Sequence, residues 1–180
     1  MAPPDDDVFA VHTEFMGSVG TYLYGRRMYD AMSLWETDPS LAGRSAGTAR
    51  FAEVWQAADK VVFSSTLAEP RTARTRLESS FEPAAVADLK AAADGDLLVG
   101  GPHLAAQALA ARLVDEVVLW VWPILLGGQN PALPSDVRAD LELVGERRIG
   151  TGVVELRHRV PDPNPAECAV RGPRSCRSRA

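Results

Sequence analysis

The stretch that most constrains the fold runs from Asp96 to Gly128 and contains the two most apolar strands of the chain. Leu97 to Val99 is a short apolar run that stops at two glycines, which indicates a strand buried on both faces. Pro102 suits the first turn of a helix because its φ is already helical, and nothing before Arg112 would break that helix. Val117 to Trp122 is the next strand. The order strand, helix, strand predicts a right-handed parallel crossover unit.

Gly100 and Gly101 separate the first of these strands from its helix. Without β-carbons they let a bulky group approach the backbone, where the helix start presents unpaired N–H groups and a partial positive charge. Such a position binds anions, and it lies at the carboxyl end of a parallel strand, where open α/β sheets usually bind ligands. Two glycines can also serve only to make a tight turn, and a lone Gly-Gly favours that simpler interpretation.

The composition is that of one ordinary soluble domain: 180 residues, 46% hydrophobic and 24% charged, with no internal repeat. The net charge of -5 argues against nucleic acid as a general partner. No apolar run approaches the ~20 residues that a membrane-spanning helix needs, and the acidic N-terminus lacks a signal region. Both cysteines, Cys168 and Cys176, fall near the C-terminus, so we expect no disulfide framework and a cytoplasmic location.

The first third of the chain predicts a helix over Asp5 to Met16 and then a strand over Val19 to Tyr24. His12 on that helix is interpreted as a packing residue, because no ligand lies at metal spacing around it, and we expect no metal site. Gly25 and Arg26 then open a second helix. A cation at a helix N-terminus opposes the macrodipole and stabilises nothing locally unless an anion joins it, which suggests a ligand there.

A third strand end carries hydroxyl groups. A helix is predicted over Thr48 to Ala58 and a strand over Lys60 to Phe63, and the strand runs directly into Ser64, Ser65 and Thr66. Hydroxyl groups in this position can donate to a phosphate, although capping and turn formation are the commoner uses of Ser and Thr.

The remaining segments are assigned from turn residues and periodicity. We predict a loop over Leu34 to Ala46, a short strand over Thr75 to Leu77, a helix over Glu82 to Ala93 capped by Ser80, an antiparallel pair formed by Leu141 to Val144 and Val153 to Leu156, and a disordered tail over 161–180. The tail is rich in proline, arginine and serine, which cannot bury enough surface to offset the entropy of ordering.

Three strand-end segments together carry a family resemblance: YGRRMYDAM at 24–32, VVFSSTL at 61–67 and VGGPHLAAQAL at 99–109. In this order, and followed by PILLGGQNPALP, they resemble the dihydrofolate reductase fold, and most closely the riboflavin-biosynthesis reductase domain and its bacterial relatives. The resemblance covers about Asp5 to Val160. It implies a three-layer α/β fold with a mostly parallel sheet and antiparallel C-terminal strands, and it implies NADPH as cofactor.

The resemblance also assigns residues to the parts of NADPH. It assigns the diphosphate to Gly25, Arg26, Gly100, Gly101, Pro102, His103 and Leu104, and the adenosine 2′-phosphate to Arg26, Ser64, Ser65 and Thr66. The Gly100–Gly101 peptide is often cis in such proteins. Val99 and Trp35 would border the reacting end of the site, and no residue is named as catalytic.

The implied activity is hydride transfer from NADPH to a pterin-like, pyrimidine or related heterocycle. The sequence departs from the family where Met28 replaces a phosphate-binding threonine, and no family-type first strand ending in Ser-Leu-Asp-Gly stands before Asp5. We therefore interpret 1–160 as a reductase domain truncated at its N-terminus. The alternative is a nucleotide-binding or subunit-interaction module that has lost activity. The resemblance further implies a homodimer that pairs through the C-terminal strands.

Overall fold

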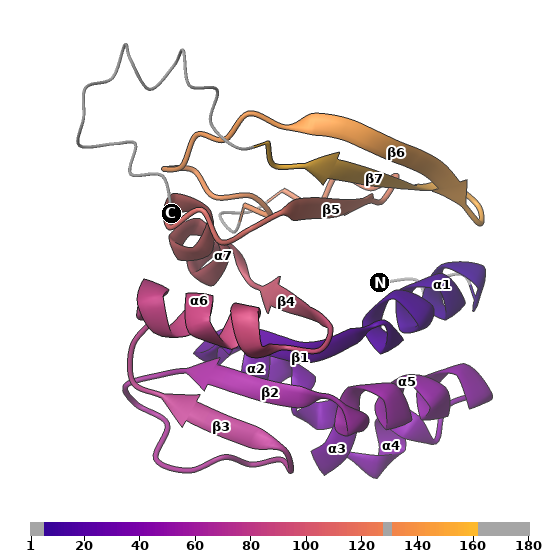
Figure 1. The fold of residues 1–180 in the computed structure, drawn as a ribbon. Helices are drawn as coiled ribbons and strands as arrows, with labels where there is room; N and C mark the ends of the chain where they lie inside the picture. The colour runs from indigo at the N-terminus through magenta and orange to yellow at the C-terminus, as the bar shows by residue number, and fades with distance from the viewer. Residues whose placement is uncertain (1–5, 128–130, 162–180) are drawn as a thin grey trace.

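The chain folds into two sheets, which the computed structural model describes over residues 6–127 and 131–161 (Figure 1). The first sheet is parallel, in the order β3-β2-β1-β4, with β1 at Val19–Gly25, β2 at Asp59–Phe63, β3 at Thr75–Glu78 and β4 at Asp96–Gly100. The second is antiparallel, in the order β5-β7-β6, with β5 at Glu116–Val121, β6 at Glu142–Ile149 and β7 at Val153–Arg159. This arrangement confirms the predicted α/β fold.

Helices cover both faces of the parallel sheet and so complete three layers. They are α1 (Asp6–Gly17), α2 (Arg26–Met32), α3 (Leu34–Thr37), α4 (Pro39–Ala42), α5 (Ala46–Ala57), α6 (Pro83–Ala92) and α7 (Pro102–Ala110). Alternation along β1 decides which side chain meets which layer. Tyr22 and Tyr24 pack with α5 and α2, whereas Leu23 packs with α6 and α7.

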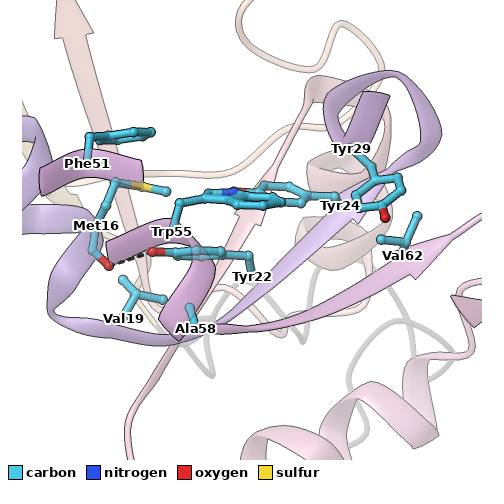
Figure 2. Packing of buried hydrophobic residues seen from close by; sticks show 9 residues of the cluster. All are labelled: Met16, Val19, Tyr22, Tyr24, Tyr29, Phe51, Trp55, Ala58 and Val62. Carbon is cyan, nitrogen blue, oxygen red and sulfur yellow. Dashed lines mark hydrogen bonds between the residues drawn. The ribbon is translucent and has the colours of Figure 1, made fainter. Parts of the chain in front are cut away.

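The core on the α5 face is unusually aromatic (Figure 2). Trp55 of α5, Tyr29 of α2 and the two tyrosines of β1 are fully buried together. Tyr22 donates a hydrogen bond to the carbonyl oxygen of Met16 at 2.8 Å, which ties the end of α1 to the central strand. Burial raises the pKa of Tyr22 to about 12, so its hydroxyl stays protonated.

Helix α1 links the two sheets. Its Met16 belongs to the aromatic core, while Val8 packs with Ile149 and Val153 of the antiparallel sheet. His12 stacks on Phe51 with the ring centroids 5.6 Å apart, as expected for a packing residue. Burial lowers the pKa of His12, which favours the neutral imidazole.

The prediction of a loop over Leu34 to Ala46 is wrong. The segment forms the single-turn helices α3 and α4, and α5 begins at Ala46. Asp38 accepts a hydrogen bond from the Ser40 amide and precedes Pro39, which starts α4, and a capping box between Ser45 and Thr48 starts α5. These short-range caps outweigh the scattered small polar residues that suggested a loop.

The predicted helix after Ser80 is present, but Ser80 is not its cap. The N-cap position is Glu82, without a side-chain cap bond, and the Ser80 hydroxyl donates to the Glu82 carboxylate at 2.9 Å. The predicted tail over 161–180 lies outside the described residues except for Pro161. No described helix has the length and apolar character needed to cross a membrane.

The predicted parallel crossover from β4 through α7 to β5 is also wrong. Within the described residues β4 pairs only with β1, and β5 pairs only with β7, so the two strands belong to different sheets. The sequence pattern of two apolar runs joined by a helix indicates two strands, but it does not show whether these strands pair with each other. Pairing depends on which backbones lie side by side in the fold. Each of these strands thus has one edge without a strand partner in the described part of the chain.

Candidate cofactor site

The central strand β1 brings the three predicted strand-end segments to one edge of the sheet. Gly25 is in register with Phe63 of β2, and Tyr24 is in register with Gly100 of β4. Because all three strands are parallel, the residues that follow them emerge side by side at the carboxyl edge. Arg26 therefore lies between Ser64 on one side and Gly101 on the other. The sheet register brings together residues that stand about 75 positions apart in the sequence.

Gly100 and Gly101, between β4 and α7, are required for different reasons. Gly101 has φ of 96°, which side chains rarely adopt, so the turn into α7 needs glycine for its backbone. A β-carbon on Gly100 would lie 2.9 Å from the Tyr24 ring and 3.3 Å from Met28. The protein's own side chains thus fill the space at Gly100 that a ligand was expected to approach. The peptide between the glycines is trans, contrary to expectation.

Open space exists instead at Gly25. A β-carbon there would meet no atom within 4 Å, and the residue has an ordinary extended conformation with φ of -76°. Glycine at this position is therefore required neither by packing nor by the backbone. The absent side chain leaves room beside the end of β1 for a ligand to approach the backbone.

The start of α7 combines one anchored and one exposed residue. Leu104 is buried in the core on the α6 face, whereas His103 is exposed, and the Ala105 amide donates to the Gly101 carbonyl oxygen at 3.0 Å. The amides of the first helical turn have no acceptor within the helix. Because the buried Leu104 holds the start of α7 in place, the free amides of its first turn can donate to an anionic group.

Arg26 has an internal anion. Its Nε lies 3.0 and 2.8 Å from the two carboxylate oxygens of Asp30, one turn later on α2. The expectation that this cation lacks a local partner is therefore wrong, because the spacing of four residues brings Asp30 onto the same side of the helix. Arg27, the next residue, is exposed.

The hydroxyl segment after β2 forms a turn. The Ser64 oxygen accepts hydrogen bonds from the amides of Thr66 and Leu67, at 3.2 and 3.1 Å. The Ser64 amide in turn donates to the Glu78 carbonyl oxygen at 2.8 Å and extends the pairing with β3. The Ser64 hydroxyl also lies 3.4 Å from the Thr66 hydroxyl, where either group can be the donor, and the exposed Ser65 is able to donate toward the carboxyl edge. Turn formation and ligand binding are therefore compatible uses of these residues.

Trp35 and Val99 lie on opposite faces of the sheet. Trp35 packs against Phe51 and Phe9, with ring centroids 4.6 and 6.2 Å away, on the α5 side. Val99 packs with Leu23 in the core on the α6 and α7 side. The structure does not bring these two predicted substrate residues together.

A separate cavity of about 380 Å³ lies between α1 and β5. It is lined by Val8, Phe9, His12, Trp120 and Trp122, none of which belongs to the predicted cofactor residues. Within residues 6–127 and 131–161, no cluster of three or more His, Cys, Asp or Glu side chains could hold a metal ion.

The chemistry of the carboxyl edge fits a phosphorylated dinucleotide. It offers a guanidinium group, hydroxyl groups, helix amides and the open space at Gly25, all of which suit phosphate oxygens. Two further charged residues beside it were not singled out in the sequence, namely Asp30 and Arg71. The spacing of Asp30 from Arg26 could have indicated their pairing, but Arg71 follows a proline in a loop and carries no sequence signal.

Solved structures share this fold. A protein from Shewanella sp. PV-4 named for riboflavin biosynthesis is 19% identical, with a TM-score of 0.65 and coverage of 90% of this chain and 84% of that chain. RibD from Acinetobacter baumannii is 15% identical, with a TM-score of 0.61 and coverage of 89% and 52%. A pyrimidine reductase-like protein from Corynebacterium diphtheriae is 15% identical, with a TM-score of 0.54 and coverage of 85% and 80%.

The family of the chain is established by its sequence and not by the similar structures. No curated protein matches the chain, and the identities to the solved structures are low enough that those structures establish the fold alone. The RibD C-terminal domain, however, matches residues 14–155, which is most of the chain and includes the three strand-end segments. The chain therefore belongs to the RibD C-terminal domain family.

Proposed function

We propose that the protein is an NADPH-dependent reductase that transfers a hydride to a pterin-like, pyrimidine or related heterocyclic substrate. Membership in the RibD C-terminal domain family supports a reductase of the riboflavin-pathway type. The observation that carries the proposal is the convergence of Gly25-Arg26, Ser64 and Gly101 at one edge of the parallel sheet. Their donors and open space match the negatively charged parts of a dinucleotide phosphate.

In this proposal the diphosphate lies over Gly25 and the first turn of α7, where amides of His103 and Leu104 donate to its oxygens. Arg26, with Ser64 and its neighbours, binds the 2′-phosphate. Bound NADPH supplies the hydride, and the protein contributes position and charge. The residues of this chain thus bind the cofactor, while the substrate contacts at its reacting end have no assigned residue beyond the expected Val99 and Trp35.

Cofactor binding is tested first by titration calorimetry of the purified chain with NADPH and NADH. We expect micromolar binding of NADPH and weaker binding of NADH, because the latter lacks the 2′-phosphate. Replacing Arg26 by Ala should reduce NADPH affinity roughly tenfold, since a partly exposed charge-assisted contact is lost, and should reduce NADH affinity less, because NADH lacks the 2′-phosphate. Absence of NADPH binding by the unaltered chain would overturn the proposal.

Turnover is tested by following NADPH absorbance with pterins, aminopyrimidines bearing a phosphoribosyl group, and related heterocycles. Oxidation that depends on one of these substrates supports a reductase. A chain that binds NADPH but oxidises it with none of them would contradict the reductase assignment. Arg26→Ala serves as the matched control, because its rate at subsaturating NADPH should fall together with its affinity.

A further inference from the structure

The loop between β2 and β3 carries a second guanidinium group beside Arg26. Nη1 of Arg71 lies 3.1 Å from Oδ1 of Asp30, and Nε of Arg26 lies 3.0 Å from the same oxygen. One carboxylate therefore holds two arginines that come from different parts of the chain. Arg26, Arg71 and Asp30 together carry two positive charges and one negative charge, in a protein whose formal net charge is -5.

The position of Arg71 is set by its backbone. Its amide donates to the hydroxyl oxygen of Tyr29 at 2.8 Å, and the amide of Thr72 donates to the same oxygen at 3.1 Å. Tyr29, a residue of α2, is fully buried. The next amide of the loop, that of Ala73, donates to the carboxylate of Glu36 at 2.7 Å. Three consecutive amides are thus anchored, while the Arg71 side chain remains about half exposed.

The backbone of Arg71 is therefore held by contacts that do not involve its guanidinium group. Tyr29 and Asp30 are neighbours on α2, so one residue holds the Arg71 backbone and the next orients its guanidinium group. Arg71 Nη1 is the atom that contacts Asp30, which leaves the rest of its planar fork available to an oxyanion. The loop also begins at Ser64, so the hydroxyl turn and Arg71 lie on one connection between β2 and β3.

We propose that Arg71 is a second cation for a phosphate monoester, that it acts with Arg26, and that the phosphate is the 2′-phosphate of the dinucleotide. This inference rests on the proposed function. Arg71 thereby contributes to the preference for NADPH over NADH, while Asp30 holds the two guanidinium groups close together and oriented when no phosphate is bound. A phosphoribosyl group of the substrate is the other source of the same chemistry.

The test compares Arg71→Gln with the matched control Arg74→Gln by calorimetry. Arg74 lies on the same loop and also makes one exposed ion pair, with Asp59 at the start of β2. The probes are NADPH, NADH, adenosine 2′,5′-bisphosphate, AMP and ribose 5-phosphate. We expect Arg71→Gln to weaken NADPH and adenosine 2′,5′-bisphosphate about tenfold, to leave NADH and AMP unchanged, and Arg74→Gln to change none of them.

The outcomes separate this inference from the proposed function. If the unaltered chain binds NADPH and Arg71→Gln leaves the NADPH to NADH ratio unchanged, the inference fails and the proposed function stands. Selective loss of ribose 5-phosphate binding would assign Arg71 to the substrate and overturn its assignment to the cofactor. If the unaltered chain binds neither NADPH nor adenosine 2′,5′-bisphosphate, both proposals fail. Unchanged NADH affinity shows that the variant remains folded.

Discussion

The ammonium group of Lys60 lies over the indole ring of Trp55, 4.2 Å from the ring centroid, and donates to the Trp55 carbonyl oxygen at 3.1 Å. A second bond reaches the Gln56 carbonyl oxygen at 3.3 Å. Lys60 is only 1% exposed, and burial lowers its pKa. A buried cation at the C-terminal end of α5 donates to carbonyl oxygens that have no N–H donor within the helix.

Replacing Lys60 by Met should therefore destabilise the fold. The apolar side chain fits a similar volume and removes the cost of burying charge, but it leaves two carbonyl groups without a donor, which costs about 1 to 3 kcal/mol. Chemical denaturation measures the difference. Lys90→Met is the matched control, because Lys90 also donates to a carbonyl oxygen, that of Leu113, but is partly exposed. Equal effects of the two substitutions would contradict the importance of burial.

Two glycine substitutions at the carboxyl edge should separate stability from binding. Gly100→Ala puts a β-carbon 2.9 Å from the buried Tyr24 ring, so it should destabilise by about 1 to 3 kcal/mol through overpacking. Gly25→Ala meets no atom within 4 Å and has a permitted backbone, so it should keep its stability. Thermal melts and NADPH calorimetry are the measurements.

The informative result is that for Gly25→Ala. Its methyl group would occupy the open space assigned to the diphosphate, so NADPH affinity should fall about tenfold although the fold is unchanged, a loss of ~1.4 kcal/mol. Unchanged affinity in a fully folded Gly25→Ala chain would argue that the diphosphate does not approach this residue.

Glu155 should make the free energy of unfolding decrease as the pH falls into the acid range. Its side chain is 3% exposed; burial alone would raise its pKa, but hydrogen bonds from Arg147 and Arg157 outweigh this and hold the pKa below its usual value. Because the folded pKa is the lower one, the contribution to stability is complete above the unfolded pKa of about 4.3 and is lost as pH falls through the folded pKa.

Chemical denaturation of the unaltered chain and of Glu155→Gln, from neutral pH down to acid pH, measures how the free energy of unfolding depends on this group. We expect the variant to be less stable by about 1 to 2 kcal/mol near neutral pH, because two arginines lose a charged acceptor. The difference should narrow in acid, where the native Glu155 also becomes protonated. The control is Glu142→Gln, whose exposed ion pair with Arg159 should contribute less than about 1 kcal/mol. A constant difference at all pH values would contradict the linkage.

We expect two copies of the chain to pair through the antiparallel sheet. Apolar side chains are exposed on its strands, including Val121 of β5, Leu143 of β6 at 52% and Val154 of β7. Val121 and Val154 are in register, so they lie on one face of neighbouring strands. A protein rarely leaves such a group of side chains in water.

Sedimentation velocity tests this expectation. The unaltered chain should sediment as a dimer at micromolar concentration, and Leu143→Lys should sediment as a monomer. Leu34→Lys is the control, because Leu34 is similarly exposed but lies on α3, far from the antiparallel strands in sequence. A monomer formed by the unaltered chain, or dimers that persist in Leu143→Lys, would contradict pairing through this sheet.

Local pattern was enough to predict most of the elements and the edge at which the candidate site lies. Short apolar runs that end at Gly25 or at Gly100 and Gly101 predict buried strands followed by helix starts, and parallel strands necessarily present those ends at one edge. The helices α3 and α4 escaped prediction because each is a single turn, too short to show an apolar periodicity; Asp38 caps α4, whereas α3 is held by Trp35, which packs on Phe51.

The sequence by itself determined the α/β class, the strand ends and the candidate residues Arg26 and Ser64, because these depend on residues close together in the chain. Only the tertiary structure decided that β4 and β5 join different sheets, since strand pairing depends on which backbones meet. It likewise decided that the Tyr24 ring fills the space at Gly100. It also brought Arg71 to Asp30, through the buried hydroxyl of Tyr29, across 41 positions of sequence. Such contacts follow from packing over long distances in the chain, which no local pattern records.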